Sequence, residues 1–256
     1  MTNPHVLILG GTTEARALGE RLSTRGGIAV TLSLAGRTAK PLPQAGSVRS
    51  GGFGGPDGLT AFLRREGIDL LVDATHPYAA RISANAQIAA SMAAIPLVTL
   101  ERPRWRPLEG DRWIHVASVE DAAARIGPEP RSVFLAIGRQ ELVPFRGFRQ
   151  HAYLVRSVDP VEPEAAPHDA TFVRDRGPFG IEEERRLFDA HLIDTVISKN
   201  SGGEATYAKI TVARERGLPV IMVDRPADPV PGAAETVDEA MAQIAHALGL
   251  PVERGE

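Results

Sequence analysis

The chain contains no cysteine among its 256 residues. This absence excludes disulfide bonds, thiolate nucleophiles and cysteine-ligated metal sites together. The seven histidines are scattered along the chain, and no two of them have the i, i+4 spacing that places a pair on one helix face for zinc. We therefore expect chemistry that needs neither a thiol nor a bound metal.

Three further features are missing. The 29 Lys and Arg residues do not exceed the 32 Asp and Glu residues, and the formal charge is −3, whereas nucleic-acid binders usually carry a basic excess. No run of eighteen apolar residues occurs, so no transmembrane helix is expected. The first residues lead directly into an apolar strand, which leaves no room for a signal peptide. We expect a cytoplasmic protein that binds neither nucleic acid nor membrane.

What the sequence does have is a regular alternation of apolar runs of strand length with helical patterns. Residues 5–9 (HVLIL) are typical of a buried strand, and residues 13–25 carry a helical apolar stripe. Further strands are predicted at 28–34, 70–73, 96–100, 113–117, 132–137, 153–158, 195–198 and 219–223. Strands separated by helices pair in parallel through crossovers, so the alternation predicts an α/β fold with doubly wound parallel sheets.

The connector at 101–112 contains two prolines and no periodicity, and it interrupts this alternation. We therefore divide the chain into two Rossmann-like halves, 1–105 and 106–256, with a cleft between them. A strand exchanged across this boundary would leave no sequence signal. The glycine-rich segment 47–55 is read as a short strand followed by a loop, and 159–168 as a loop.

The run ILGGTTEAR, which begins at Ile8, lies where the first strand turns into the first helix. Glycines there allow a tight turn and a close backbone approach, and the free N–H groups of the helix N-terminus attract phosphate. The pattern departs from G-x-G-x-x-G because Thr12 and Ala15 occupy the second and third glycine positions. It predicts a dinucleotide phosphate site that comprises Gly10, Gly11, Thr12, Thr13 and Arg16; a tight turn without a ligand is the alternative.

The end of the second strand bears on which dinucleotide would bind. NAD-specific sites place an Asp or Glu there for the ribose 2′-OH, and a nearby Arg favours a 2′-phosphate. This strand ends in LSLAGRT, which contains no acid but offers Ser33 and Arg37. The pattern favours NADPH over NADH, and a solvated Arg37 without a ligand role is the alternative.

The hexapeptide DATHPY, which begins at Asp73, follows a strand at the carboxyl edge, where α/β sheets bind ligands. His76 could donate a proton or position a nicotinamide, and Tyr78 could stack or donate. We expect Asp73 to hydrogen-bond the backbone, and Pro77 to begin the next helix with Thr75 or His76 as its cap. A structural or surface role is the alternative for His76.

The second half offers anion-binding groups at two strand ends. One strand ends at Gly138 and Arg139, and the run SKNSGGEATYAK begins at Ser198, where another strand turns into a helix. Backbone donors and lysines at the second turn would suit carboxylates or phosphate: Lys199, Ser201, Gly202, Gly203 and Lys209. The alternative is a glycine pair that only ends the strand, beside solvated lysines.

Together these segments resemble the precorrin-6A reductase family of corrin-ring biosynthesis. The matching runs beside ILGGTTEAR are DATHPYAAR from Asp73, ERPRW from Glu101, SKNSGG from Ser198, TYAK from Thr206 and PVIMVDRP from Pro219. They follow the family's order over nearly the whole chain, outside 38–60 and 159–180. The resemblance implies that NADPH reduces one double bond of precorrin-6A to give precorrin-6B, with hydride added to one ring carbon and a proton to its neighbour.

The resemblance also implies roles for individual residues. Thr75, His76 and Pro77 would lie near the nicotinamide, while Ser33 and Arg37 would hold the 2′-phosphate. The proton donor stays open among His76, Tyr78, Lys199 and water. A substrate with many carboxylates needs basic groups around it; the candidates are Arg16, Arg81, Arg104, Arg139, Lys199 and Lys209.

Several alternatives remain at this stage. The ring could contain cobalt when it is reduced, since both variants of the pathway use related reductases. The chain could instead be another NADP-dependent reductase of a small molecule, a non-catalytic nucleotide-sensing module, or a transferase that uses a nucleotide-activated donor. Contacts with other corrin-pathway enzymes and the oligomeric state are left open.

Overall fold

The computed structural model describes residues 3–36, 43–226 and 228–251, and the chain divides into two compact units. The first unit comprises Met1–Arg102 and Ala227–Glu256, and the second comprises Pro103–Pro226. The chain therefore leaves the first unit, builds the second, and returns to the first. Among the described residues, no helix is long and apolar enough to cross a membrane.

The first unit contains a five-stranded parallel sheet in the order β3-β2-β1-β4-β5. Its strands are β1 (His5–Leu9), β2 (Ala29–Leu34), β3 (Ser47–Ser50), β4 (Leu70–Asp73) and β5 (Leu97–Thr99). Its helices are α1 (Thr13–Arg25), α2 (Pro56–Arg65), α3 (Ala80–Ala93) and α7 (Val237–Ala247). The strand order reverses between β1 and β4, and such a switch point is where doubly wound sheets bind ligands.

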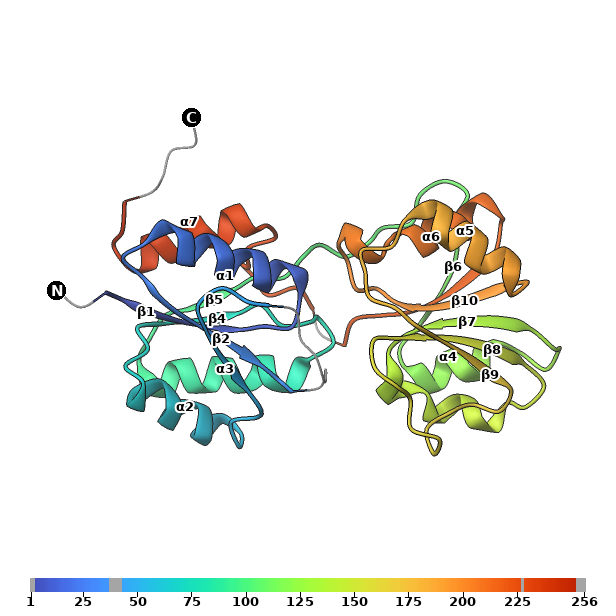
Figure 1. Ribbon diagram of the computed structural model, residues 1–256, viewed down its shortest axis with the longest axis horizontal. Helices are drawn as coiled ribbons and strands as arrows, with labels where there is room; N and C mark the ends of the chain where they lie inside the picture. Colours follow the sequence, from blue (N-terminus) through green and yellow to red (C-terminus); the bar gives the residue numbers. More distant parts are fainter. Residues whose placement is uncertain (1–2, 37–42, 227, 252–256) are drawn as a thin grey trace. The chain divides into compact units, whose positions relative to one another are not determined.

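Helices cover both faces of this sheet, α1 and α7 on one face and α2 and α3 on the other (Figure 1). Successive side chains of a strand point to opposite faces. Ile8 accordingly packs with Leu18 of α1 and Ile244 of α7, and Leu7 packs with Leu63 of α2. Because both faces are buried, β1 is a continuous apolar run rather than an alternating one.

The second unit contains a six-stranded parallel sheet in the order β6-β11-β10-β7-β8-β9. Its strands are β6 (Arg112–Val116), β7 (Ser132–Ala136), β8 (Ala152–Ser157), β9 (Ala170–Arg174), β10 (Thr195–Lys199) and β11 (Pro219–Val223). Its α-helices are α4 (Val119–Arg125), α5 (Ile181–Ala190) and α6 (Ala208–Glu215). Its core includes Phe134 of β7 and Phe188 of α5, whose rings meet edge to face with centroids 5.3 Å apart.

The predicted α/β class with two doubly wound parallel sheets is confirmed, and three details of the sequence-based assignment differ. Strand β9 was not predicted, because it lies at a sheet edge and exposes Phe172, so its residues show no apolar run. The turn predicted to lead from the strand at 195–198 into a helix contains a short 3-10 turn, Glu204–Thr206, before α6. The division at 105 assigned residues 227–256 to the second half.

The C-terminal segment instead returns to the first unit. The backbone of Ala234 forms a parallel bridge with Leu100, which extends the first sheet beyond β5. Ala240 and Ile244 of α7 are then buried in the same core cluster as Val6. The apolar face of α7 thus finds its partner more than two hundred residues away in the sequence, a pairing that local patterns do not encode.

His151 makes the stability of the second unit sensitive to pH. Its ring is 1% exposed and lies beside Phe148 and Tyr153. Burial lowers the pKa of His151 below its ordinary value, an effect that the Gly127 carbonyl and Asp194 only partly offset. The folded state therefore favours the neutral ring. The free energy of unfolding falls as the pH drops below the pKa of this histidine in the unfolded chain, about 6.5.

We expect urea unfolding of the second unit to shift to lower urea between pH 7.5 and pH 5.5. Both tryptophans, Trp105 and Trp113, lie in this unit, so their fluorescence reports on it alone. In the His151→Phe variant the shift should be smaller, because the titrating ring is gone while the aromatic packing is kept. An equal shift in the variant and the wild type would refute this assignment.

Candidate active site

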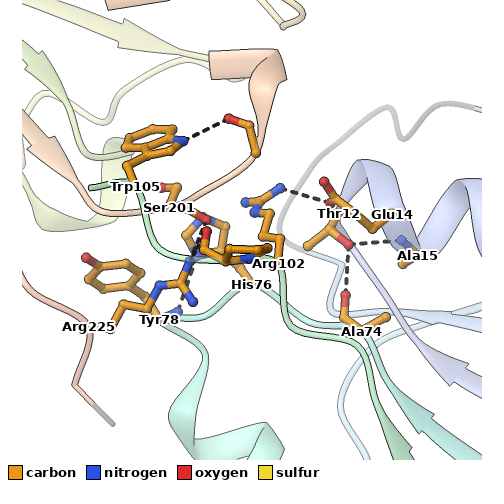
Figure 2. Close-up of polar contacts among 12 residues, drawn as sticks. Thr12, Glu14, Ala15, Ala74, His76, Tyr78, Arg102, Trp105, Ser201 and Arg225 are labelled. Carbon is orange, nitrogen blue, oxygen red and sulfur yellow. Dashed lines mark hydrogen bonds and ion pairs between the residues drawn. The ribbon is translucent and has the colours of Figure 1, made fainter. Parts of the chain in front are cut away.

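The glycine turn of the first unit joins β1 to α1 at the switch point. The Gly10 N–H donates to the Ser33 carbonyl at the end of β2 (2.9 Å). Thr12 is the N-cap of α1, and its hydroxyl accepts from the Ala15 N–H (3.1 Å). The same hydroxyl donates to the Ala74 carbonyl just after β4 (2.8 Å), as Figure 2 shows. The turn is therefore tied to strands on both sides of β1.

Each of the two glycines in this turn is required for a different structural reason. A Cβ on Gly10 would lie 3.1 Å from Leu32 Cδ1 and 3.3 Å from Ala15 Cβ, so Gly10 lets α1 pack closely on the sheet. Gly11 has a φ of +118°, which disfavours other residues, and a Cβ there would meet nothing within 4 Å. An open backbone turn at a helix N-terminus fits a dinucleotide phosphate. Thr13 and Arg16 are exposed beside it.

One acidic residue in the first turn of α1 could repel that phosphate. The Glu14 carboxylate contacts Arg102 (Figure 2), at 2.9 Å from its Nη1. Both side chains are largely buried. The guanidinium compensates the negative charge, so the positive end of the helix dipole remains available to an anion. Sequence reasoning missed Arg102, because the two residues are 88 positions apart.

The DATHPY segment forms a polar turn after β4. Asp73 accepts from both the backbone N–H (3.1 Å) and the hydroxyl (2.7 Å) of Thr75, which confirms the expected bond to the backbone. The Tyr78 N–H donates to Nδ1 of His76 (3.3 Å), and the two rings lie 5.6 Å apart. With Nδ1 accepting, the proton of the neutral His76 ring is on Nε2.

The helix predicted to begin at Pro77 begins instead at Ala80, with Ala79 as a cap that forms no side-chain bond. The Ala79 N–H donates to the His76 carbonyl (2.7 Å), which closes a tight turn over the intervening residues. Neither Thr75 nor His76 therefore caps the helix. The turn leaves the side chains of His76, Pro77 and Tyr78 half-buried at the carboxyl edge of the sheet.

The predicted 2′-phosphate residues are only partly described. Ser33 lies near the carboxyl end of β2 and is 5% exposed, while Arg37 lies outside the described residues. The cation that reaches Ser33 is Arg49 of β3, whose Nη1 lies 2.8 Å from the Ser33 hydroxyl. No local pattern pointed to Arg49, because it stands in the short segment read as a strand and loop.

The other residues predicted to bind anions lie at the carboxyl edge of the sheet in the second unit. Gly138 is exposed after β7 with a φ of +92°. Arg139 donates to the Pro160 carbonyl (3.0 Å) and lies 4.0 Å from the Asp159 carboxylate. Lys199, the last residue of β10, forms an ion pair with Glu141. These side chains are brought together because β7 and β10 are neighbouring parallel strands.

The turn after β10 is held by residues that the prediction did not assign. Asn200 exchanges two hydrogen bonds with the backbone of Trp105, at 2.8 and 3.0 Å. The buried Arg225 guanidinium donates to the carbonyls of Asn200 (2.9 Å), Ser201 (3.2 Å) and Pro103 (3.3 Å). With the carbonyls of this turn engaged, its shape is fixed while Gly202 and Gly203 adopt positive φ values.

The remaining predicted basic residues differ in exposure. Arg81 is exposed and Arg104 is half-buried. Lys209 is only 4% exposed: its ammonium donates to the Thr206 carbonyl and lies 4.8 Å from the centre of the Trp105 ring. The Trp105 indole N–H in turn donates to the Gly203 carbonyl (3.0 Å). Lys209 therefore supports Trp105 and the glycine turn rather than facing solvent.

Among the residues that the structure describes, no group of three or more His, Asp or Glu side chains could hold a metal ion. The first unit, with its capped glycine turn at the switch point of a parallel sheet, has the architecture of the Rossmann-like nucleotide-binding α/β proteins.

The chain belongs to the precorrin-6x reductase CbiJ/CobK family, which it matches over residues 5–245. It is 51% identical to the precorrin-6A reductase of Sinorhizobium sp over 251 residues, 97% of this chain and 95% of that protein. It is 30% identical to the cobalt-precorrin-6A reductase of Salmonella typhimurium over 245 residues, 91% of each chain. The solved structure of CobK precorrin-6A reductase has a TM-score of 0.91 and 42% identity, and covers 98% of this chain and 99% of that one.

The Arg102–Glu14 pair can be tested through nucleotide binding. Arg102→Gln should leave an uncompensated carboxylate in the phosphate turn and weaken binding of a nicotinamide dinucleotide roughly tenfold or more. Glu14→Gln in the same chain should restore most of this loss, since the charge is its cause. Arg21→Gln, which removes an exposed pair with Asp238 near the same helix, is the control and should change little. Isothermal titration calorimetry would measure each affinity, and a double variant as weak as Arg102→Gln would contradict the explanation.

Proposed function

We propose that this chain reduces one double bond of precorrin-6A with NADPH, in cobalamin biosynthesis. Family membership over nearly the whole chain supports the reaction class. The observation that carries the cofactor assignment is the open glycine turn, capped by Thr12 at the switch point of the first sheet. The absence of an acid at the end of β2 favours NADPH over NADH.

The substrate we propose is the metal-free ring. The relative named precorrin-6A reductase shares 51% of its aligned residues with this chain, whereas the relative named cobalt-precorrin-6A reductase shares 30%. The cytoplasmic location stays a prediction from the sequence.

Different residues of the chain would bind the cofactor and supply the proton to the ring. The backbone N–H groups of Gly11, Thr12 and Thr13 would hold the pyrophosphate, with Arg16 beside them. When bound, NADPH supplies the hydride that adds to one carbon of the ring double bond. The neighbouring carbon must then receive a proton, so the balance of the reaction requires one acidic group on the protein or a water molecule.

His76 is the proton donor that we favour among the four candidates. Its Nδ1 accepts the Tyr78 N–H, which holds the ring in one orientation, so Nε2 is the ring nitrogen that would pass the proton to the substrate. Lys199 is instead paired with Glu141, and its ammonium suits a carboxylate of the substrate. The other groups proposed for substrate carboxylates are Arg81, Arg104, Arg139 and the backbone N–H groups of Ser201, Gly202 and Gly203.

The reaction itself can be tested with purified protein. Mixed with precorrin-6A, the protein should oxidise NADPH in step with conversion of the ring, and NADH should be much poorer. Loss of the reduced nicotinamide absorbance, followed together with the spectrum of the tetrapyrrole, would measure both. If NADPH binds but is never oxidised by precorrin-6A or its cobalt form, the proposed reaction is wrong.

The role of His76 predicts a particular kinetic pattern. His76→Gln keeps a side-chain acceptor for the Tyr78 N–H but removes the acid, so kcat should fall about a hundredfold or more with the KM for NADPH nearly unchanged. Tyr78→Phe is the matched control, since it removes the neighbouring hydroxyl and keeps the ring; it should retain most of the wild-type turnover. If Tyr78→Phe loses turnover while His76→Gln retains it, Tyr78 rather than His76 is the proton donor.

A further inference from the structure

Arg49 is placed by β3 beside the end of β2. In the parallel register Arg49 stands opposite Ser33, and its Nη1 lies 2.8 Å from the Ser33 hydroxyl. It also donates to the carbonyls of Gly51 (3.0 Å) and Gly52 (3.1 Å), and these bonds fix the guanidinium at the carboxyl edge of the sheet. In a Rossmann-like unit this edge faces the ribose that carries the 2′ substituent.

Among the described residues, no carboxylate forms an ion pair with Arg49, whereas the neighbouring Arg65 pairs with Glu66 at 2.9 Å. The guanidinium lies over the ring of Phe53, 3.8 Å from its centre. Burial and the positive charge of Arg65 lower the pKa of Arg49. A fixed, partly desolvated cation in a positive field is an environment that favours a bound anion.

The protein does not use all the N–H donors of Arg49, and the others could bind such an anion. A guanidinium has five N–H donors, and the bonds to Ser33, Gly51 and Gly52 use three of them. A phosphate at this edge could therefore accept from the remaining two, in the paired arrangement that guanidinium groups form with phosphates. The Ser33 hydroxyl, which accepts from Arg49, can donate its own proton to the same phosphate.

We propose that Arg49, together with Ser33, binds the 2′-phosphate of the dinucleotide and sets the preference for NADPH over NADH. The inference rests on the proposed function in one respect, namely that the first unit binds a nicotinamide dinucleotide. It adds a residue for which the sequence provided no signal, and it requires no contribution from Arg37.

Two nucleotides that differ only in the 2′-phosphate test this site without turnover. Calorimetric titration with adenosine 2′,5′-bisphosphate and with adenosine 5′-monophosphate would measure the preference directly. The wild-type protein should bind the bisphosphate more tightly. Arg49→Gln should weaken bisphosphate binding about tenfold to a hundredfold and leave monophosphate binding unchanged, because only the 2′-phosphate loses its partner.

Two further variants separate charge from structure. Arg49→Lys keeps the positive charge and should retain part of the preference. Arg65→Gln removes the neighbouring cation, which stacks on Phe62 and pairs with Glu66, and should lower the preference much less than Arg49→Gln, because Arg65 contributes only its field. An Arg49→Gln protein that loses affinity equally for both nucleotides would show that Arg49 only shapes the Gly51–Gly52 turn, and would overturn the proposal.

The remaining outcomes distinguish this inference from the proposed function. An unchanged preference in Arg49→Gln, or a wild-type protein that binds both nucleotides equally, would overturn the role of Arg49 while leaving dinucleotide binding intact. A wild-type protein that binds neither nucleotide nor NADPH would overturn the proposed function, and the inference with it.

Discussion

The Thr12 hydroxyl makes the two hydrogen bonds on which the proposed cofactor site depends. By accepting from the Ala15 N–H it caps α1, and by donating to the Ala74 carbonyl it fixes the helix N-terminus to the end of β4. The Gly10 N–H secures the other side of the turn at Ser33. The N-terminus of α1 is thereby held at the switch point, where the backbone N–H groups and the helix dipole both favour a bound anion. A glycine at position 12, as the familiar motif has, could not make either side-chain bond.

The second unit holds its turn after β10 by different means. No side chain caps a helix there. Instead, Arg225 donates hydrogen bonds to the carbonyls of Asn200 and Ser201, and the Asn200 side chain forms two hydrogen bonds with the backbone of Trp105. Buried hydrogen bonds to a charged group are costly to leave unmade, so the turn is specified as strongly as a capped helix end. Both units thus place a rigid turn at a carboxyl edge, one suited to a phosphate and the other to carboxylates.

The parts of this arrangement that local patterns encode were predictable. Apolar runs located most strands, and the glycine turn and the segment from Asp73 were found because their residue types have local physical consequences. The partners of those segments were not found: Arg102 for Glu14, Arg49 for Ser33 and Arg225 for Ser201 each lie on another segment of the fold, 16 to 88 residues away. The return of α7 to the first unit and the edge strand β9 were missed for a related reason, since tertiary packing rather than local periodicity determines them.

A crystal structure of the protein with NADPH would show whether the turn from Gly10 to Glu14 holds the dinucleotide. We expect phosphate oxygens within hydrogen-bonding distance of the N–H groups of Gly11 to Thr13. We also expect the Thr12 hydroxyl to remain bonded to the Ala74 carbonyl, and Glu14 to Arg102. Density for the pyrophosphate at any other strand edge, with this turn empty, would show that the dinucleotide binds elsewhere.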